Sequence, residues 1–262
     1  MDLGVKGRVA VVTGASHGIG RAAARQLAAE GASVLLVGRG GDALAEACGE
    51  CRSAGGDAQP LELDVTTEGA GERIVRMAED TFGPLDLLVS SAGTNWARPL
   101  AELTEEDFER HWRLHLLAPF ALFQAAVPKM AHRGYGRVVT VASIASKRPS
   151  LFNLAYAVVK AAQLSLTRGY ADAFARQGVT VNSVLPGPVD TEMWAGVLEQ
   201  TARDRGVPLP EVIAQAEAST QRGRFATPDE VGAVIAFLCS EQAANVTGAA
   251  YMCDGGSVQA LY

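Results

Sequence analysis

Several features are scarce or missing in this chain of 262 residues. No stretch of about 18 residues is free of charged side chains, so the sequence predicts no membrane-spanning helix. Residues 1–7 lead directly into a strand pattern, which argues against a signal peptide. The net charge is −6 and the basic residues are scattered, which argues against a nucleic-acid surface. The expectation is a cytoplasmic protein with no nucleic-acid or membrane partner.

Cysteine is also scarce. Among the four cysteines, Cys48 and Cys51 have the C-x-x-C spacing of redox and metal sites. They fall within a polar helical pattern, with no second pair and no histidine nearby. We interpret them as reduced thiols, with a redox or metal role as the alternative, and we predict no metal site.

Apolar residues make up 48% of the chain, enough for the core of one large domain. Strand patterns alternate with helix patterns from end to end, with no linker, repeat or low-complexity tract. This alternation predicts one α/β domain over residues 1–262, with a doubly wound parallel sheet and helices on both faces. The helical segment at about 192–225 is expected to close over the substrate as a lid.

The segment 8–20 joins a β-branched strand to a helix through a turn that contains Gly14, Gly18 and Gly20. Such a turn directs backbone N–H groups and the positive end of the helix toward one point, which suits a diphosphate. The spacing G-x-x-x-G-x-G differs from the common G-x-G-x-x-G, but the glycines have the same uses. The alternative is a tight turn with a structural role only.

Small and polar residues follow the carboxyl ends of the predicted strands, where ligands bind in such sheets. They predict one continuous cofactor groove. Its expected residues are Gly14, Ser16, His17, Gly18, Ile19, Gly20, Arg39, Asp64, Val65, Ser91, Ala92, Gly93, Tyr156, Lys160, Pro186, Gly187, Val189 and Thr191.

The end of the second strand predicts the choice of cofactor. A carboxylate there would bond the ribose 2′-OH of NAD and repel a 2′-phosphate, but no acid occurs before Asp42. Arg39 stands there instead, and its planar guanidinium can pair with a phosphate. NADP(H) is therefore favoured over NAD(H), with a plain surface arginine as the alternative. His17 is a further candidate donor to the same phosphate.

Tyr156 and Lys160 are spaced to share one helix face. A free tyrosine has a pKa of about 10, and a neighbouring ammonium is expected to lower it. The pair can then move a proton to or from a carbinol oxygen while a hydride moves to or from a nicotinamide. Ser143, at the end of the fifth predicted strand, adds a hydroxyl that can orient the substrate oxygen.

With these residues the chain resembles the short-chain dehydrogenase/reductase family over nearly its whole length, and most closely its 3-oxoacyl-carrier-protein-reductase-like subgroup. The resemblance rests on residues 13–20, Ser143, the Tyr156-x-x-x-Lys160 pair, Pro186-Gly187 and residues 254–256. It implies a seven-stranded Rossmann-type sheet and reversible oxidoreduction of a carbonyl and an alcohol. It also implies Tyr156 as acid/base, Lys160 on the nicotinamide ribose, Ser143 on the substrate oxygen, and a homotetramer built by the two long helices, a dimer being the alternative.

The chain departs from the family pattern at two positions. Ser90-Ser91-Ala92-Gly93 replaces the family's Asn-Asn-Ala-Gly, so Ser91 has a shorter reach. His115 stands where the family places an asparagine that helps to hold a relay water. Either His115 takes over that part and makes the relay titratable near neutrality, or it is a packed helix residue.

The substrate pocket is expected to be mostly apolar, which favours a lipophilic or cyclic ketone or alcohol, or an acyl thioester. Its predicted lining residues are Asn95, Trp96, Ile144, Phe152, Met193, Trp194 and Val197.

Two other functions remain as alternatives. Gly14-Ala15-Ser16-His17-Gly18 fits the G-x-S-x-G elbow of a serine hydrolase, but no histidine follows residue 132 to complete a triad in the usual order. The second alternative is a nucleotide-sensing protein without catalysis, against which Ser143, Tyr156 and Lys160 argue.

Overall fold

The computed structural model describes residues 2–259, and the outer ends of the predicted domain, residue 1 and residues 260–262, lie outside them. The described chain forms a sheet of seven parallel strands in the order β3-β2-β1-β4-β5-β6-β7. The strands are β1 Val9–Thr13, β2 Ser33–Gly38, β3 Ala58–Glu62, β4 Leu85–Ser90, β5 Gly136–Val141, β6 Val179–Pro186 and β7 Ala250–Cys253. The order reverses between β1 and β4, which is where ligands bind in open sheets of this kind.

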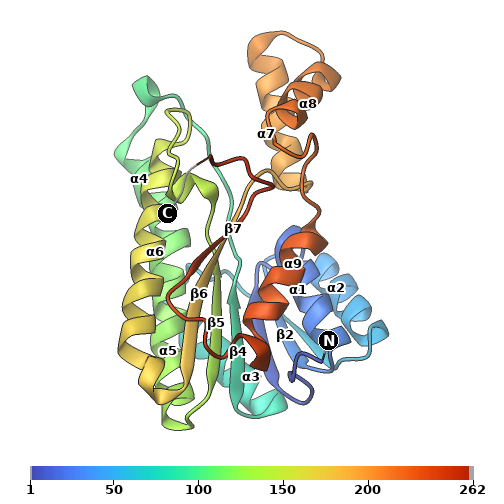
Figure 1. Cartoon of the computed structure of the whole chain (residues 1–262), viewed down its shortest axis with the longest axis vertical. Helices are drawn as coiled ribbons and strands as arrows, with labels where there is room; N and C mark the ends of the chain where they lie inside the picture. The colour runs from blue at the N-terminus through green and yellow to red at the C-terminus, as the bar shows by residue number, and fades with distance from the viewer. Residues whose placement is uncertain (1, 260–262) are drawn as a thin grey trace.

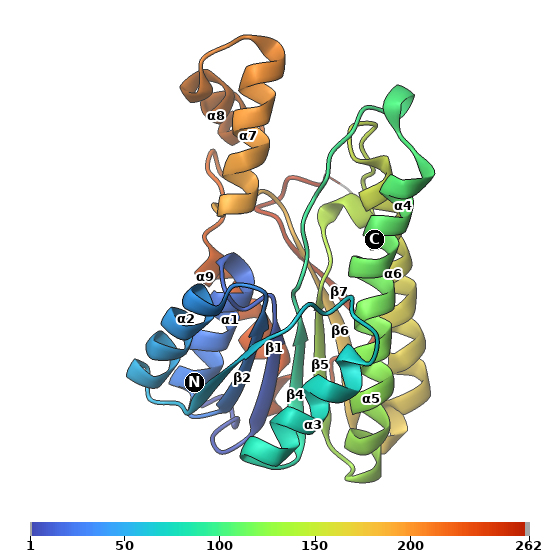
Figure 2. The same ribbon diagram turned by 180° about the vertical axis from the view of Figure 1, so that it is seen from behind.

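Helices cover both faces of the sheet, as Figures 1 and 2 show. One face carries α1 Gly18–Ala29, α2 Gly41–Ser53 and α9 Pro228–Leu238. The other carries α3 Ala70–Phe82, α4 Glu105–Trp112, α5 Ala118–His132 and α6 Leu154–Phe174. This arrangement confirms the predicted single doubly wound α/β domain.

The central strand β1 explains why its sequence is apolar throughout. Ala10 and Val12 pack with the core under α1 and α9, whereas Val9 and Val11 pack with the core under α3 and α5. Successive residues of a strand point to opposite faces, so a strand covered on both sides needs apolar residues at every position.

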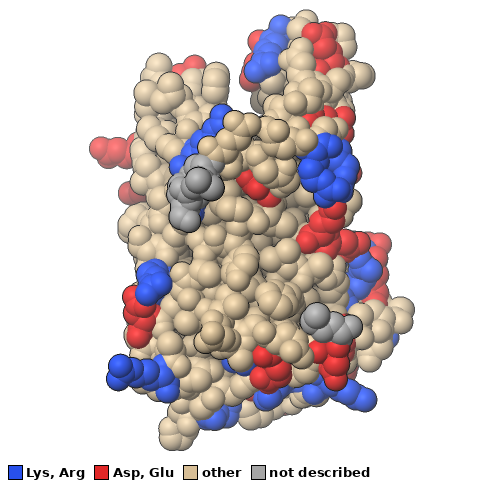
Figure 3. Space-filling model, viewed as in Figure 1, with Lys and Arg blue, Asp and Glu red and all other residues tan. Residues whose placement is uncertain are grey.

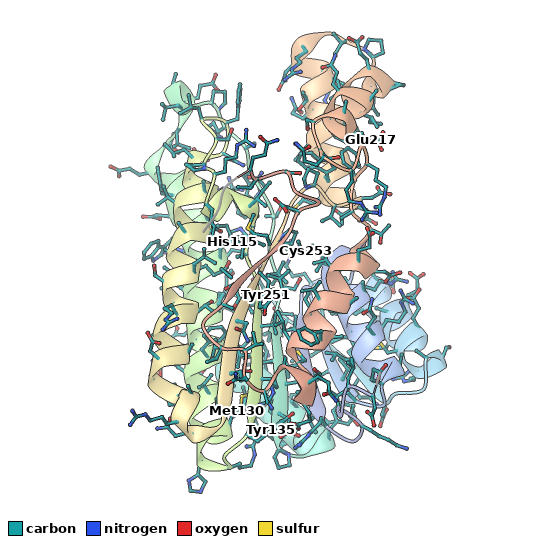
Figure 4. All side chains as sticks on the ribbon, in the orientation of Figure 1. His115, Met130, Tyr135, Glu217, Tyr251 and Cys253 are labelled. Atoms are coloured by element: carbon teal, nitrogen blue, oxygen red, sulfur yellow. The ribbon has the colours of Figure 1, made fainter. Side chains whose placement is uncertain are left out.

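The helical run that contains α4 and α5 is interrupted. A π-helical turn, Arg113–Leu117, separates α4 from α5. It ends two residues before Pro119, which has no N–H to donate to the regular helical hydrogen bonds. The turn carries His115, which is 1% exposed. Figure 4 shows His115 among the long helices beside the sheet.

One helical run, Glu105–His132, is long and apolar enough to cross a membrane, judged by length and composition alone. The charge pattern of the sequence predicts no such helix. Within its apolar window, 44% of the residues are buried in the domain, where α5 packs on α3 and on the sheet. The domain therefore covers one side of this helical run. On the face that Figure 3 shows, basic and acidic residues are interspersed and form no continuous basic stripe.

Two helices, α7 Glu192–Arg205 and α8 Leu209–Ala218, project from the carboxyl end of the sheet (Figure 1). They have a small apolar cluster of their own, made of Leu198, Ala202 and Val212. Below them, Glu230 at the start of α9 receives hydrogen bonds from Arg222 and Arg224 and thereby fixes the segment that returns from α8.

Candidate active site

A cavity of about 710 Å³ opens at the carboxyl ends of the strands. All the residues expected in the cofactor groove line it, from Gly14 in the first turn to Thr191 at the start of α7. Ser143, Tyr156, Lys160 and His115 line the same cavity. The structure therefore brings the predicted cofactor and catalytic residues together around one space.

The glycine turn after β1 is built by close backbone approaches. Gly14 has a φ of +65°, and a Cβ there would lie 2.8 Å from the backbone nitrogen of Ala92. A Cβ on Gly20 would overlap the carbonyl oxygen of Gly14. The hydroxyl of Thr13 accepts hydrogen bonds from the backbone N–H groups of Ser91 and Ala92, at 3.1 and 3.2 Å. The turn and the end of β4 are thus fixed against each other at the floor of the cavity.

The first turn of α1 is free to bind an anion. The helix begins at Gly18, its N-cap His17 makes no side-chain capping bond, and no acid lies in the first turn. Its N–H groups and the positive end of its dipole face the cavity without a protein carboxylate to satisfy them. This arrangement fits the diphosphate of a dinucleotide.

The ends of β2 and β3 form the far end of the groove. Arg39 is exposed there and lines the cavity. Asp64 accepts hydrogen bonds from the N–H and the hydroxyl of Thr66, at 2.9 and 2.7 Å. These bonds, helped by the charge of Arg39, lower the pKa of Asp64 below its ordinary value. His17 also lines the cavity, and its Nε2 lies 3.7 Å from a carboxylate oxygen of Glu192 on α7.

The catalytic candidates come from β5 and α6. Ser143 follows β5, where its hydroxyl accepts a hydrogen bond from the N–H of Ala145 at 3.1 Å. Lys160 is 3% exposed, and its Nζ lies 5.6 Å from the ring centroid of Tyr156, one turn earlier on α6. Burial lowers the pKa of Lys160 to about 7.

The pKa of Tyr156 differs from the expectation. Burial raises it to about 12, and a hydrogen bond with Ser143 acts in the opposite direction. Lys160 donates no hydrogen bond to Tyr156: its Nζ donates to the carbonyl oxygen of Val141 at 2.7 Å and to Oε1 of Gln163 at 3.1 Å. Tyr156 therefore keeps its proton at neutral pH, which is the form that donates to a carbonyl oxygen.

His115 belongs to a cluster of rings around Tyr156. Its ring lies 5.3 Å from that of Tyr156, edge to face, and stacks at 5.5 Å on His111, one turn earlier. Nε2 of His115 lies 2.8 Å from the carbonyl oxygen of Thr94, so Nε2 carries the hydrogen. Nδ1 is then an acceptor, and it is buried without a partner among the described residues.

The pKa of His115 does not fit the expectation that this residue makes the relay titratable near neutrality. Burial and the charge of Lys160 hold its pKa well below the ordinary value. Its imidazole is therefore neutral at neutral pH and does not titrate there.

The expected substrate residues separate into two groups. Asn95, Ile144, Met193, Trp194 and Val197 line the cavity. Among the described residues, Trp96 and Phe152 do not line the cavity, contrary to the expectation. Trp96 packs between the guanidinium of Arg110 and the ring of His111, and Phe152 is 68% exposed.

Sequence reasoning missed several residues near the chemistry. Arg148, Ser150 and Asn153 also line the cavity, and they come from the loop that joins β5 to α6. Gln163 was also missed, although its Oε1 accepts a hydrogen bond from Nζ of Lys160 at 3.1 Å. Its signal was present, since a glutamine three residues after the lysine on an apolar helix face needs a buried partner.

The C-x-x-C pair and the possible metal ligands can be judged by burial and by spacing in the folded chain. Cys48 and Cys51 are free and buried, and burial raises the pKa of both thiols, that of Cys51 to about 12. Within residues 2–259, no cluster of three or more histidine, cysteine or acidic side chains could hold a metal ion.

Comparison with known proteins places this site in a family. The sequence model of a protein family described as enoyl-(acyl carrier protein) reductase matches residues 14–258. Galactitol 2-dehydrogenase from Agrobacterium fabrum strain C58 is 33% identical over 95% of this chain and 97% of its own length.

Two solved structures extend the likeness to the fold. L-sorbose reductase from Gluconobacter frateurii, complexed with NADPH and L-sorbose, has a TM-score of 0.94 at 33% identity over 100% of both chains. A 3-oxoacyl-(acyl-carrier-protein) reductase from Agrobacterium tumefaciens C58 with NADP bound has a TM-score of 0.88 at 35% identity, over 97% of this chain and 95% of the other. The chain belongs to the short-chain dehydrogenase/reductase family of oxidoreductases, which includes enzymes that interconvert CH–OH and carbonyl groups.

Proposed function

We propose that this protein is an NADP(H)-dependent oxidoreductase that interconverts a carbonyl and a secondary alcohol, with Tyr156 as the acid/base. One observation carries the proposal. Ser143, Tyr156 and Lys160 line the same cavity as the uncapped first turn of α1, so proton transfer and dinucleotide binding share one space.

The cavity supports NADP(H) as the cofactor. The first turn of α1 fits the diphosphate, and Arg39 is exposed at the end of β2, which itself contains no carboxylate that would repel a 2′-phosphate. The related reductases with NADPH or NADP bound point to the same cofactor. A bound nicotinamide supplies or takes up the hydride.

The protein's own residues handle the proton. In reduction, neutral Tyr156 donates its proton to the carbonyl oxygen, which Ser143 orients by a hydrogen bond. The Lys160 ammonium would stabilise the resulting phenolate, and it would hold the nicotinamide ribose of the bound cofactor. His115, as a neutral imidazole with Nδ1 free to accept, is suited to hold a water from which Tyr156 regains a proton.

For the substrate we propose a mostly apolar ketone or alcohol, because Ile144, Met193 and Val197 line its part of the cavity. The α7–α8 pair is expected to act as the lid over it. A polyol is the second candidate, since Asn95 and Asn153 line the same cavity and two relatives are named for galactitol and L-sorbose.

Two proposals concern the whole protein. We expect a homotetramer formed by the long helices, whose exposed apolar side chains include Phe108, Trp112 and Phe120. A cytoplasmic location stays a prediction.

The central experiment tests a panel of cyclic ketones, 3-oxoacyl thioesters, ketoses and their alcohols with both cofactors, read by nicotinamide absorbance. Tyr156→Phe keeps the ring and removes the proton, so turnover should fall roughly 10²- to 10⁴-fold with NADPH affinity nearly unchanged.

Tyr170→Phe is the matched control on the same helix, because that hydroxyl is buried without a partner in the described chain, and it should retain full activity. Retention of most activity by Tyr156→Phe would remove Tyr156 from the mechanism. NADPH binding without turnover of any panel member would favour the nucleotide-sensing alternative.

A further inference from the structure

The buried side of α6 carries a glutamine directly against the catalytic lysine. Gln163 is 2% exposed and lies three residues after Lys160, on the same helix face. Nζ of Lys160 donates hydrogen bonds to Oε1 of Gln163 at 3.1 Å and to the carbonyl oxygen of Val141 at 2.7 Å. An ammonium has three N–H donors, so one is left for the cavity that Lys160 lines.

The backbone at Gln163 is fixed to the sheet. The hydroxyl of Thr167 donates to the carbonyl oxygen of Gln163 at 3.0 Å and accepts from the hydroxyl of Ser183 on β6 at 2.9 Å. Thr167 and Ser183 are both buried. The glutamine side chain therefore starts from a rigid base, and its oxygen holds a fixed place beside Nζ.

The surroundings of Lys160 offer dipoles rather than counter-charges. Tyr156 lies one turn earlier on α6, β5 contributes the carbonyl of Val141, and the π turn and α4 contribute His115 and His111. The charge of Lys160 helps to lower the pKa of both histidines, so both favour the neutral form. No carboxylate within residues 2–259 forms an ion pair with Lys160. Two uncharged oxygens therefore carry the stabilisation of its ammonium.

We propose that Gln163 is a positioning residue whose side-chain oxygen keeps the Lys160 ammonium charged and aimed at Tyr156 and the cofactor. The consequence for turnover rests on the function proposed above, whereas the effect on Lys160 does not. Burial already brings the pKa of Lys160 to about 7, so loss of one acceptor should leave the lysine largely neutral at neutral pH.

The test follows Lys160 itself. The chain has only four lysines, at positions 6, 129, 147 and 160, so protein labelled with ¹³C at lysine Cε gives four titrating NMR signals, and Lys160→Arg assigns the one of interest. Gln163→Leu removes the acceptor at similar volume and should lower the titration midpoint of Lys160 by roughly one to two pH units. Gln163→Glu supplies a charged acceptor and should raise it.

Tyr170→Phe on the same helix is the matched control, because it removes a buried hydroxyl that has no hydrogen-bond partner among the described residues, and it should leave the midpoint unchanged. In the pH–rate profile, Gln163→Leu should move the limb that Lys160 governs to lower pH by the same amount, while Tyr170→Phe should keep the wild-type profile. If Gln163→Leu does not fold, Gln163→Met gives the same comparison with an unbranched chain.

A midpoint in folded Gln163→Leu or Gln163→Met within about 0.3 pH unit of wild type would reduce Gln163 to a packing residue. This outcome is distinct from failure of the proposed function. If Tyr156→Phe remains active, the reaction assignment fails, but the titration of Lys160 still decides what Gln163 does.

Discussion

At the scale of single residues, Arg39 is the side chain on which cofactor choice depends. Arg39→Asp places a carboxylate where it can bond a ribose 2′-OH and repel a 2′-phosphate. We expect the parent protein to bind NADPH more tightly than NADH and the variant to reverse the order, measured by quenching of tryptophan fluorescence.

Arg76→Asp is a control with the same charge change on the exposed surface of α3, and it should keep the parent preference. Equal affinity of the parent for both cofactors would mean that Arg39 does not read the phosphate.

His115 yields a prediction in which the sign of the pKa shift matters. Its pKa is held well below the ordinary value of about 6.5, so Nδ1 is an acceptor over the whole neutral range. Protonation at low pH would place a hydrogen on Nδ1 and remove that acceptor. In the pH–rate profile, the rate should therefore fall along an acid limb only at pH values well below about 6.5. Near neutral pH, His115 should cause no change in the rate.

His115→Asn restores the family's residue and should lose this limb while it retains or exceeds the parent rate at neutral pH. The measurement is kcat against pH for both proteins, with circular dichroism to verify folding at the acid end. Identical profiles and identical rates would show that His115 only packs in the π turn.

At the scale of elements, the joint between β1 and α1 determines whether the cofactor groove can form. A Cβ on Gly20 would overlap the carbonyl oxygen of Gly14, which is backbone and cannot move aside independently. We expect Gly20→Ala to lower the free energy of unfolding by roughly 1–3 kcal/mol and to weaken NADPH binding, because the first turn of α1 must shift.

Gly49→Ala on α2 is the control, since a Cβ there meets no atom within 4 Å and alanine has the higher helix propensity. Urea unfolding and NADPH titration of both variants make the comparison. Unchanged stability and affinity in Gly20→Ala would mean that the joint is less closely packed than its geometry indicates.

At the scale of the whole molecule, the long helices expose apolar side chains at intervals of four or eight residues, Phe108, Trp112 and Phe120. A second copy of the chain would remove them from water, which supports the expected tetramer. Trp112→Glu should lower the mass found by light scattering to that of a dimer or monomer. Met77→Glu, an equally exposed apolar site on α3, should leave it unchanged, and a monomeric parent protein would contradict the proposal.

The sequence by itself determined the parts of this protein that depend on local pattern. Apolar strands alternating with helices predict a sheet covered on both faces, and β1 is apolar because it has both faces to fill. The glycine turn, the four-residue spacing of Tyr156 and Lys160, and a hydroxyl at the end of β5 are likewise readable, since each involves neighbours along one element or a strand end. These features were enough to identify the family.

The tertiary structure decided what depends on neighbours distant in the sequence. The carbonyl of Val141 and the amide of Gln163 accept the hydrogen bonds of Lys160, and burial raises the pKa of Tyr156 above its ordinary value. The π turn buries His115 against Thr94 and near Lys160, and burial together with the charge of Lys160 keeps its imidazole neutral. Hydrogen bonds and desolvation act over a few ångströms in space, and a chain pattern carries no record of which groups will meet there.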